Sequence, residues 1–172
     1  LLGWLRTVRY DSPMDVQDHT ALDLLRAFSK LEYLFKRMRP FRTQDHHGNA
    51  FTNWNAVMDA ANALRSEQFV DRVRPEHRAL ILEGDRNRPA KEKANDVPGE
   101  SLVRWEPLPL KPHDAPGLID AMRRVRNNLF HGGKQVPTEQ ALAGTNEEWA
   151  QAACDVAQRL LDAATEDEIL TL

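Results

Sequence analysis

The chain has 172 residues, of which 41% are hydrophobic and 28% are charged, and its formal net charge at neutral pH is −3. This length predicts one domain, and no apolar run approaches the roughly 18 residues that a membrane span requires. The negative charge excludes a general attraction to nucleic acid, so any such binding must depend on a local basic patch.

The first predicted helix is long and amphipathic. It lies between Pro13, which suits a first helical turn, and Pro40, which stops it, and Asp11 or Ser12 can cap its start. Its apolar positions recur at helical spacing, and they are Ala21, Leu24, Leu25, Phe28, Leu31, Phe35 and Met38. The next segment, residues 41–50, is mostly polar and lacks periodicity, which predicts a loop.

A second helix is predicted after a cap at Thr52 or Asn53. Its apolar side carries Trp54, Val57, Met58, Ala61 and Leu64. Short helical turns are predicted next, one of them opened by Pro75. Residues at about 84–100 are charged and have no apolar stripe, which predicts a solvated loop. The prolines of residues 101–112 predict an extended segment that lies across the domain.

The third long helix is predicted to begin at a cap, Asp114, and to end at Gly132 and Gly133. Its apolar stripe is Leu118, Met122, Val125 and Leu129. A final helix is predicted from about Glu147 to Ala164, with Trp149, Ala153, Val156, Leu160 and Ala163 on its core side. The predicted fold class is all-α, a bundle of four main helices with short extra helices.

The string RVRNNLFHGGK, residues 124–134, ends the third long helix. On an ideal helix the side chains of Arg126 and His131 would point about 140° apart, so an undistorted helix cannot make them partners. The double glycine lets the helix end near His131, which can then turn away. Arg123, Asn127 and His131 share one face, so Asn127 can orient the imidazole. The negative end of the helix dipole favours a protonated imidazole, so His131 can titrate near neutral pH.

Arg126, followed directly by Asn127 and after three more residues by His131, resembles the signature of HEPN domains, in which four to six residues separate an arginine from a histidine. The string FSKLEYLFKR, residues 28–37, in the first long helix resembles a prokaryotic solo branch of the same family. The resemblance spans residues 20–164.

The resemblance implies that residues 1–172 form a single HEPN-like helical domain with its core at about 13–164. Members of this family commonly form dimers in which the two motifs face each other. Active members are metal-independent ribonucleases in toxin, phage-defence and RNA-processing settings. We therefore expect a homodimer that binds RNA and uses no cofactor and no metal, with an antitoxin or another protein as a further partner.

Carried onto this chain, the resemblance places Arg126, Asn127 and His131 in the site. Cleavage of RNA by the neighbouring 2′-hydroxyl needs a base, an acid and a cation that stabilises charge on the phosphoryl oxygens. His131 can serve as base or acid, and Arg126 as a bidentate phosphate clamp. A two-fold dimer would supply a second histidine for the other proton transfer. Arg123 and Lys134 are predicted to contact RNA.

Glu32 lies on or beside the apolar arc of the first long helix. A carboxylate there is costly to bury without a partner, so it is a candidate supporting residue whose expected partner is Arg126. The alternative is an exposed pair with Lys36, worth only about 0.3 to 0.5 kcal/mol.

Two other interpretations of the motif stay open. One is a non-catalytic HEPN module that dimerises or binds a nucleotide or a protein. The other is a plain helix end, in which His131 and Lys134 complement the helix dipole. His46 and His47 are adjacent in a polar loop without further ligands at suitable spacing, so no metal site is predicted there.

The single cysteine, Cys154, allows no internal disulfide and no cysteine-based zinc site, as is typical of a reducing compartment. The N-terminal string LLGWLRTVRY is too short and too interrupted by charge to be the apolar part of a signal peptide. We therefore expect a cytoplasmic protein that does not associate with membranes.

Overall fold

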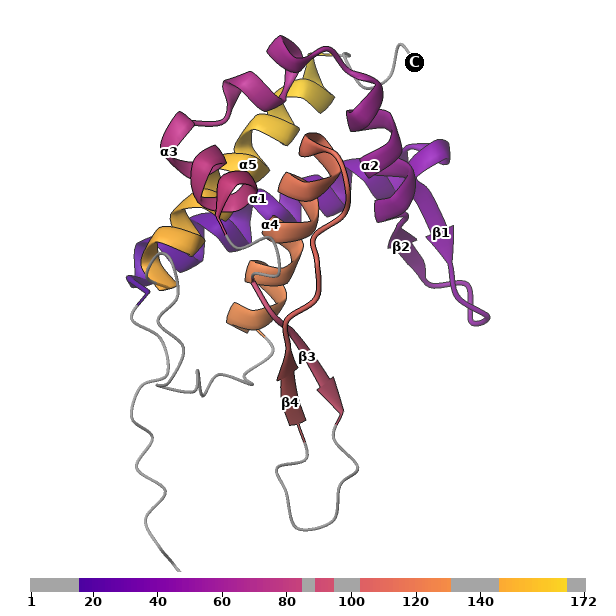
Figure 1. Cartoon of the computed structure of the whole chain (residues 1–172). Coiled ribbons are helices and arrows are strands. Elements are labelled where there is room, and N and C mark those ends of the chain that lie inside the picture. Colours follow the sequence, from indigo (N-terminus) through magenta and orange to yellow (C-terminus); the bar gives the residue numbers. More distant parts are fainter. Residues whose placement is uncertain (1–15, 85–88, 95–102, 131–145, 167–172) are drawn as a thin grey trace, which may run out of the picture.

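Three long helices pack together in the computed structural model of the chain (Figure 1). They are α1 (Asp18–Arg37), α4 (Asp114–Phe130) and α5 (Asn146–Thr165), and α5 packs against both of the others. The structure describes residues 16–84, 89–94, 103–130 and 146–166. In these parts of the chain, no helix is both long enough and apolar enough to span a bilayer.

Helix α1 begins later than the sequence predicts. Residue Gln17 is extended and Asp18 opens the helix, so a continuous helix from the first turn predicted at Pro13 is wrong, while Pro13 itself and the predicted caps Asp11 and Ser12 lie outside the described residues. The reason is a long-range contact, because the carboxylate of Glu147 in α5 accepts hydrogen bonds from the Gln17 backbone N–H at 2.8 Å and from Thr20 Oγ1 at 2.6 Å. The helix stops before Pro40, as predicted.

The predicted loop after the first helix is wrong, because it contains a small antiparallel hairpin of β1 (Arg42–Gln44) and β2 (Ala50–Thr52). Asp45 closes its turn by accepting hydrogen bonds from the backbone N–H and the side-chain amide of Asn49, each at 2.9 Å. Gly48 has φ +82°, a backbone conformation that favours glycine. Turn chemistry therefore makes this hairpin without an apolar alternation.

Helix α2 (Trp54–Ala63) begins where the sequence predicts. The side chain of Asn53 caps it by accepting a hydrogen bond from the backbone N–H of Ala56 at 3.3 Å. The predicted short turns follow, with Pro75 opening one of them, and they are η2 (Ser66–Gln68), η3 (Val70–Arg72), α3 (Pro75–Arg78) and η4 (Ala79–Glu83).

A second antiparallel hairpin consists of β3 (Lys91–Ala94) and β4 (Val103–Glu106), and it projects away from the helices (Figure 1). The prediction of a loop over about 84–100 is therefore wrong at β3, whereas the extended segment predicted next does contain β4. Strand pairing, which a single segment cannot reveal, defines β3. The predicted all-α class holds for the bundle and not for these two hairpins.

The core lies between the three long helices and α2. The apolar stripes predicted for α4 and α5 are buried in full. An aromatic cluster joins α1 to α2, with the rings of Phe28 and Trp54 centred 5.1 Å apart and those of Phe35 and Trp54 6.0 Å apart. Helix α5 is rich in buried alanine, which lets α1 and α4 approach it closely.

Candidate functional site

The described part of the motif is the C-terminal end of α4, which ends at Phe130. Arg123, Arg126 and Asn127 belong to it, whereas His131 and Lys134 lie outside the described residues. The catalytic role of His131 and the RNA contact of Lys134 therefore stay predictions. The polar residues of α4 that can be placed divide between two faces.

The first face of α4 contacts the base of the hairpin formed by β3 and β4. The side chain of Arg124 is only 4% exposed, and its Nη2 atom donates to Asp120 Oδ2 at 2.7 Å. Its two terminal nitrogens also donate to the backbone carbonyl oxygens of Pro89, Leu108 and Pro109. The guanidinium therefore ties the chain that enters the hairpin to the chain that leaves it.

Asn128 lies four residues after Arg124 and so shares this face. Its Nδ2 atom donates to the carbonyl oxygen of Ala90 at 2.9 Å, and Asp120 accepts a weaker bond from the backbone N–H of Lys111 at 3.3 Å. Two polar residues of the motif string, Arg124 and Asn128, thus have structural roles that the sequence did not reveal.

The second face carries Arg126 and Asn127. The Arg126 guanidinium carbon lies 4.8 Å from the centre of the Phe28 ring of α1, and its Nη1 atom donates to Asn127 Oδ1 at 3.1 Å. Arg126 is half-buried and Asn127 is exposed. Stacking on an aromatic ring orients a guanidinium and leaves its edge able to bind an oxyanion. The carbonyl oxygen of Asn127 orients Arg126, and its amide nitrogen can donate to an imidazole.

Glu32 lies on α1 and is half-buried. Its charge acts on Arg123. Burial lowers the pKa of Arg123 below its ordinary value, and the carboxylates of Asp120 and Glu32 offset only part of that effect. Arg126, the partner expected for Glu32, packs on the Phe28 ring of the same helix as Glu32. The pairing of Glu32 with Arg126 therefore stays a prediction, and the described structure adds Arg123 as a residue on which the charge of Glu32 acts.

Arg123 packs over the indole ring of Trp54, with its guanidinium carbon 5.4 Å from the ring centre. It is three residues from Arg126, so the two guanidiniums lie on neighbouring parts of the same helix surface. Together they form a local positive region, and a bidentate phosphate contact is the chemistry that such a region offers. Over the described residues, no three His, Cys, Asp or Glu side chains are arranged to hold a metal ion.

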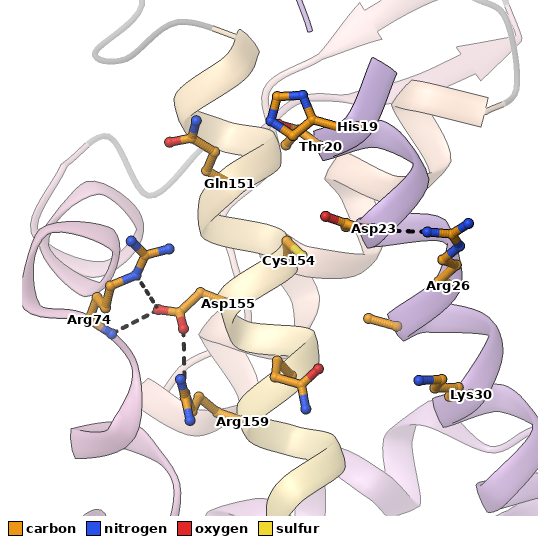
Figure 2. A pocket seen from close by; sticks show the side chains of 12 residues that line it. His19, Thr20, Asp23, Arg26, Lys30, Arg74, Gln151, Cys154, Asp155 and Arg159 are labelled. Carbon is orange, nitrogen blue, oxygen red and sulfur yellow. Dashed lines mark hydrogen bonds and ion pairs between the residues drawn. The ribbon is translucent and has the colours of Figure 1, made fainter. Parts of the chain in front are cut away.

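A second polar cluster lies in a groove of about 590 Å³ between α1 and α5 (Figure 2). At its edge the buried Asp155 accepts hydrogen bonds from the backbone N–H of Arg74 at 2.8 Å and from Arg159 Nε at 3.4 Å. Its Oδ2 atom also lies 3.0 Å from Nδ1 of His77. Burial raises the pKa of Asp155, but the hydrogen bonds from the Arg74 backbone and from His77 outweigh burial and leave the pKa below its ordinary value. The carboxylate is therefore ionised at neutral pH.

The sequence did not predict this groove, because its residues come from α1, α5 and the segment before α3. Cys154 lies in it, and burial raises the pKa of its thiol. The only local signal was the spacing of Asp155 and Arg159, which places both side chains on one face of α5.

Comparison with known proteins found no match to a family model, to a curated protein or to a solved structure. The likeness to HEPN domains therefore depends on the sequence motif itself.

Proposed function

We propose that the protein is a metal-independent endoribonuclease of the HEPN type that acts as a homodimer. The observation that carries the proposal is the hydrogen bond between Arg126 Nη1 and Asn127 Oδ1 on the half-exposed face of α4, a few residues before His131. A helical bundle in which the motif lies at the end of a helix with a buried apolar stripe supports it further.

In the proposed reaction, Arg126 binds the scissile phosphate and offsets the charge that develops on its oxygens. Its stacking on Phe28 and its bond to Asn127 hold the guanidinium before the substrate arrives, so less ordering is needed on binding. His131 of one subunit accepts the proton of the 2′-hydroxyl, and the same residue of the second subunit donates a proton to the leaving 5′-oxygen.

A second candidate is a non-catalytic HEPN module that dimerises or binds a nucleotide or protein partner. The packing of Arg126 on Phe28 favours it, because a purely structural arginine would occupy the same place and gain about 0.5 to 1 kcal/mol from the ring. The two candidates differ in whether Arg126 affects RNA cleavage or only stability.

The test is incubation of the purified protein with labelled total RNA in excess EDTA. Wild type is compared with His131→Ala and Arg126→Ala, after circular dichroism has shown that all are equally folded. Two exposed residues away from α4 provide matched controls, His46→Ala and Arg65→Ala. We expect a loss of at least about 100-fold in the first two variants and none in the controls. No cleavage by wild type, or equal cleavage by all variants, contradicts the proposal.

A mixing experiment tests the dimer. Mixing wild type with an excess of His131→Ala forms mixed dimers that retain a single His131. Because the proposed reaction uses one histidine from each subunit, we expect these mixed dimers to lose cleavage. If the activity falls only in proportion to the dilution of wild type although subunits exchange, the proposed sharing is wrong.

A further inference from the structure

The groove between α1 and α5 is separate from the motif. Its volume of about 590 Å³ lies within the range of small-molecule sites. Asp23 and Lys30 line it from α1, whereas Glu32, nine residues after Asp23, points about 180° away on the same helix. The groove and the motif therefore use opposite sides of α1, and a ligand in one does not cover the other.

The charge of the groove is opposite to that of the whole chain. Its ionised side chains comprise four cations and two carboxylates, a net charge of +2 in a chain of −3, and they are Arg26, Lys30, Arg74, Arg159, Asp23 and Asp155. Cations that converge on one concave surface raise the local concentration of anions. The groove is thus the kind of surface that attracts an anionic ligand.

Asp155 does not compete with such a ligand. Its side chain is only 4% exposed, and its oxygens are occupied by His77, Arg74 and Arg159. It holds the two arginines by their Nε atoms, at 3.6 Å for Arg74 and 3.4 Å for Arg159. Side chains fixed in this way lose little conformational entropy when they bind.

The terminal nitrogens of these arginines are only partly engaged in the described contacts. The Arg74 side chain is 58% exposed and uses only Nε and its backbone N–H in the described contacts. The Arg159 side chain is 38% exposed, and its Nη1 atom donates to Asp162 Oδ2 at 3.1 Å. The Nη1 and Nη2 atoms of Arg74 and the Nη2 atom of Arg159 can therefore donate to a planar or tetrahedral oxyanion.

The opposite wall of the groove belongs to α1. Figure 2 shows Arg26 and Lys30 across from Arg74 and Arg159, with Cys154 between the two walls. Arg26 is 64% exposed, and its contact with Asp23 is long at 3.7 Å. Lys30 is exposed and forms no ion pair in the part of the chain that the structure describes. Cations on two walls suit a ligand with more than one anionic group.

We propose that the groove between α1 and α5 binds a phosphate-bearing ligand through Arg74 and Arg159 on one wall and Arg26 and Lys30 on the other. Guanidinium forks pair with phosphate oxygens in a bidentate way, and an ammonium adds a point charge. The phosphate belongs either to a small phosphorylated compound or to an RNA strand. The inference does not depend on the proposed ribonuclease activity.

Calorimetric titration with inorganic pyrophosphate tests the proposal. Wild type is compared with the double variant Arg26→Gln and Lys30→Gln, whose changes lie on the exposed side of α1. A second double variant, Lys36→Gln and Arg37→Gln, removes the same charge from the same helix outside the groove and is the control. We expect stoichiometric binding by wild type and control, and a loss of at least about tenfold in the groove variant.

The single cysteine gives a second measurement that locates the ligand. Pyrophosphate should slow the reaction of Cys154 with N-ethylmaleimide in wild type and not in the groove variant. A short single-stranded RNA is the second probe. Protection of Cys154 by pyrophosphate alone identifies a small phosphorylated ligand. Protection of Cys154 by both probes identifies a groove that also holds an RNA backbone. Absence of binding and protection with both probes, or an equal loss in the control variant, overturns the proposal and leaves the RNA cleavage assay unaffected.

Discussion

Helices α4 and α5 contain the same local pattern, an aspartate followed four residues later by an arginine, with opposite results. In both helices the carboxylate is buried, and it contacts the arginine of its own helix at 2.7 Å in α4 and 3.4 Å in α5. The Arg124 side chain is 4% exposed and the Arg159 side chain 38%. The spacing sets the pairing, but it does not decide whether the arginine is enclosed.

The difference comes from the segment that covers each aspartate. Over α4, Pro89, Leu108 and Pro109 present carbonyl oxygens, which accept hydrogen bonds from Arg124 and enclose it. Over α5, the N-terminal end of α3 and the residue before it present donors instead, the ring of His77 and the backbone N–H of Arg74. These donors satisfy Asp155 without enclosing Arg159, which stays at the rim of the groove.

The largest expected effect separates the two arginines directly. Arg124→Gln leaves Asp120 buried without its cation and three carbonyl groups without their donor, so we expect the free energy of unfolding to fall by about 3 kcal/mol or more. Arg159→Gln removes a half-exposed partner from a carboxylate that keeps two others, and it should cost less than about 1 kcal/mol. Urea unfolding of both variants measures the two values. Similar losses would show that the arginines play the same part.

The next effect concerns Asp155 and its pH dependence. Because its pKa is lowered on folding, the stabilisation is complete above the unfolded value of about 4 and is lost as the pH falls through the folded value. Asp155→Asn should therefore lower the free energy of unfolding at pH 7 by about 2 kcal/mol, and the gap to wild type should narrow below about pH 4. Urea unfolding at pH 7 and pH 3 checks the sign. An equal gap at both pH values would contradict an ionised, stabilising Asp155.

The sequence predicts the helices well, because burial of an apolar stripe is a local property. The stripe from Leu118 to Leu129 and the cap at Asn53 are where the sequence places them. The predictions for the start of α1 and for the segment that forms strand β3 were wrong for the same reason. Each depends on a partner far along the chain, Glu147 for the first and β4 for the second.

The candidate site follows the same division. Sequence spacing placed Arg126 and Asn127 beside each other on α4, and they are hydrogen bonded there. It did not distinguish them from Arg124 and Asn128, which bind the carbonyl oxygens of Pro89 and Ala90 beside the second hairpin. The groove was missed altogether, since three separate segments supply its cations.

The smallest expected effect uses this pair of neighbouring asparagines. Asn128→Ala removes the half-buried hydrogen bond to the carbonyl oxygen of Ala90 and should lower the free energy of unfolding by about 1 kcal/mol. Asn127→Ala changes an exposed side chain and should stay within about 0.5 kcal/mol of wild type. Urea unfolding gives both values, and the RNA cleavage assay should reverse the ranking, with Asn127→Ala the more impaired. The two residues are identical in type and adjacent in sequence, so only the face of α4 that each occupies can produce opposite rankings. Equal effects of the two substitutions in both assays would argue against a division of the helix into a structural and a functional face.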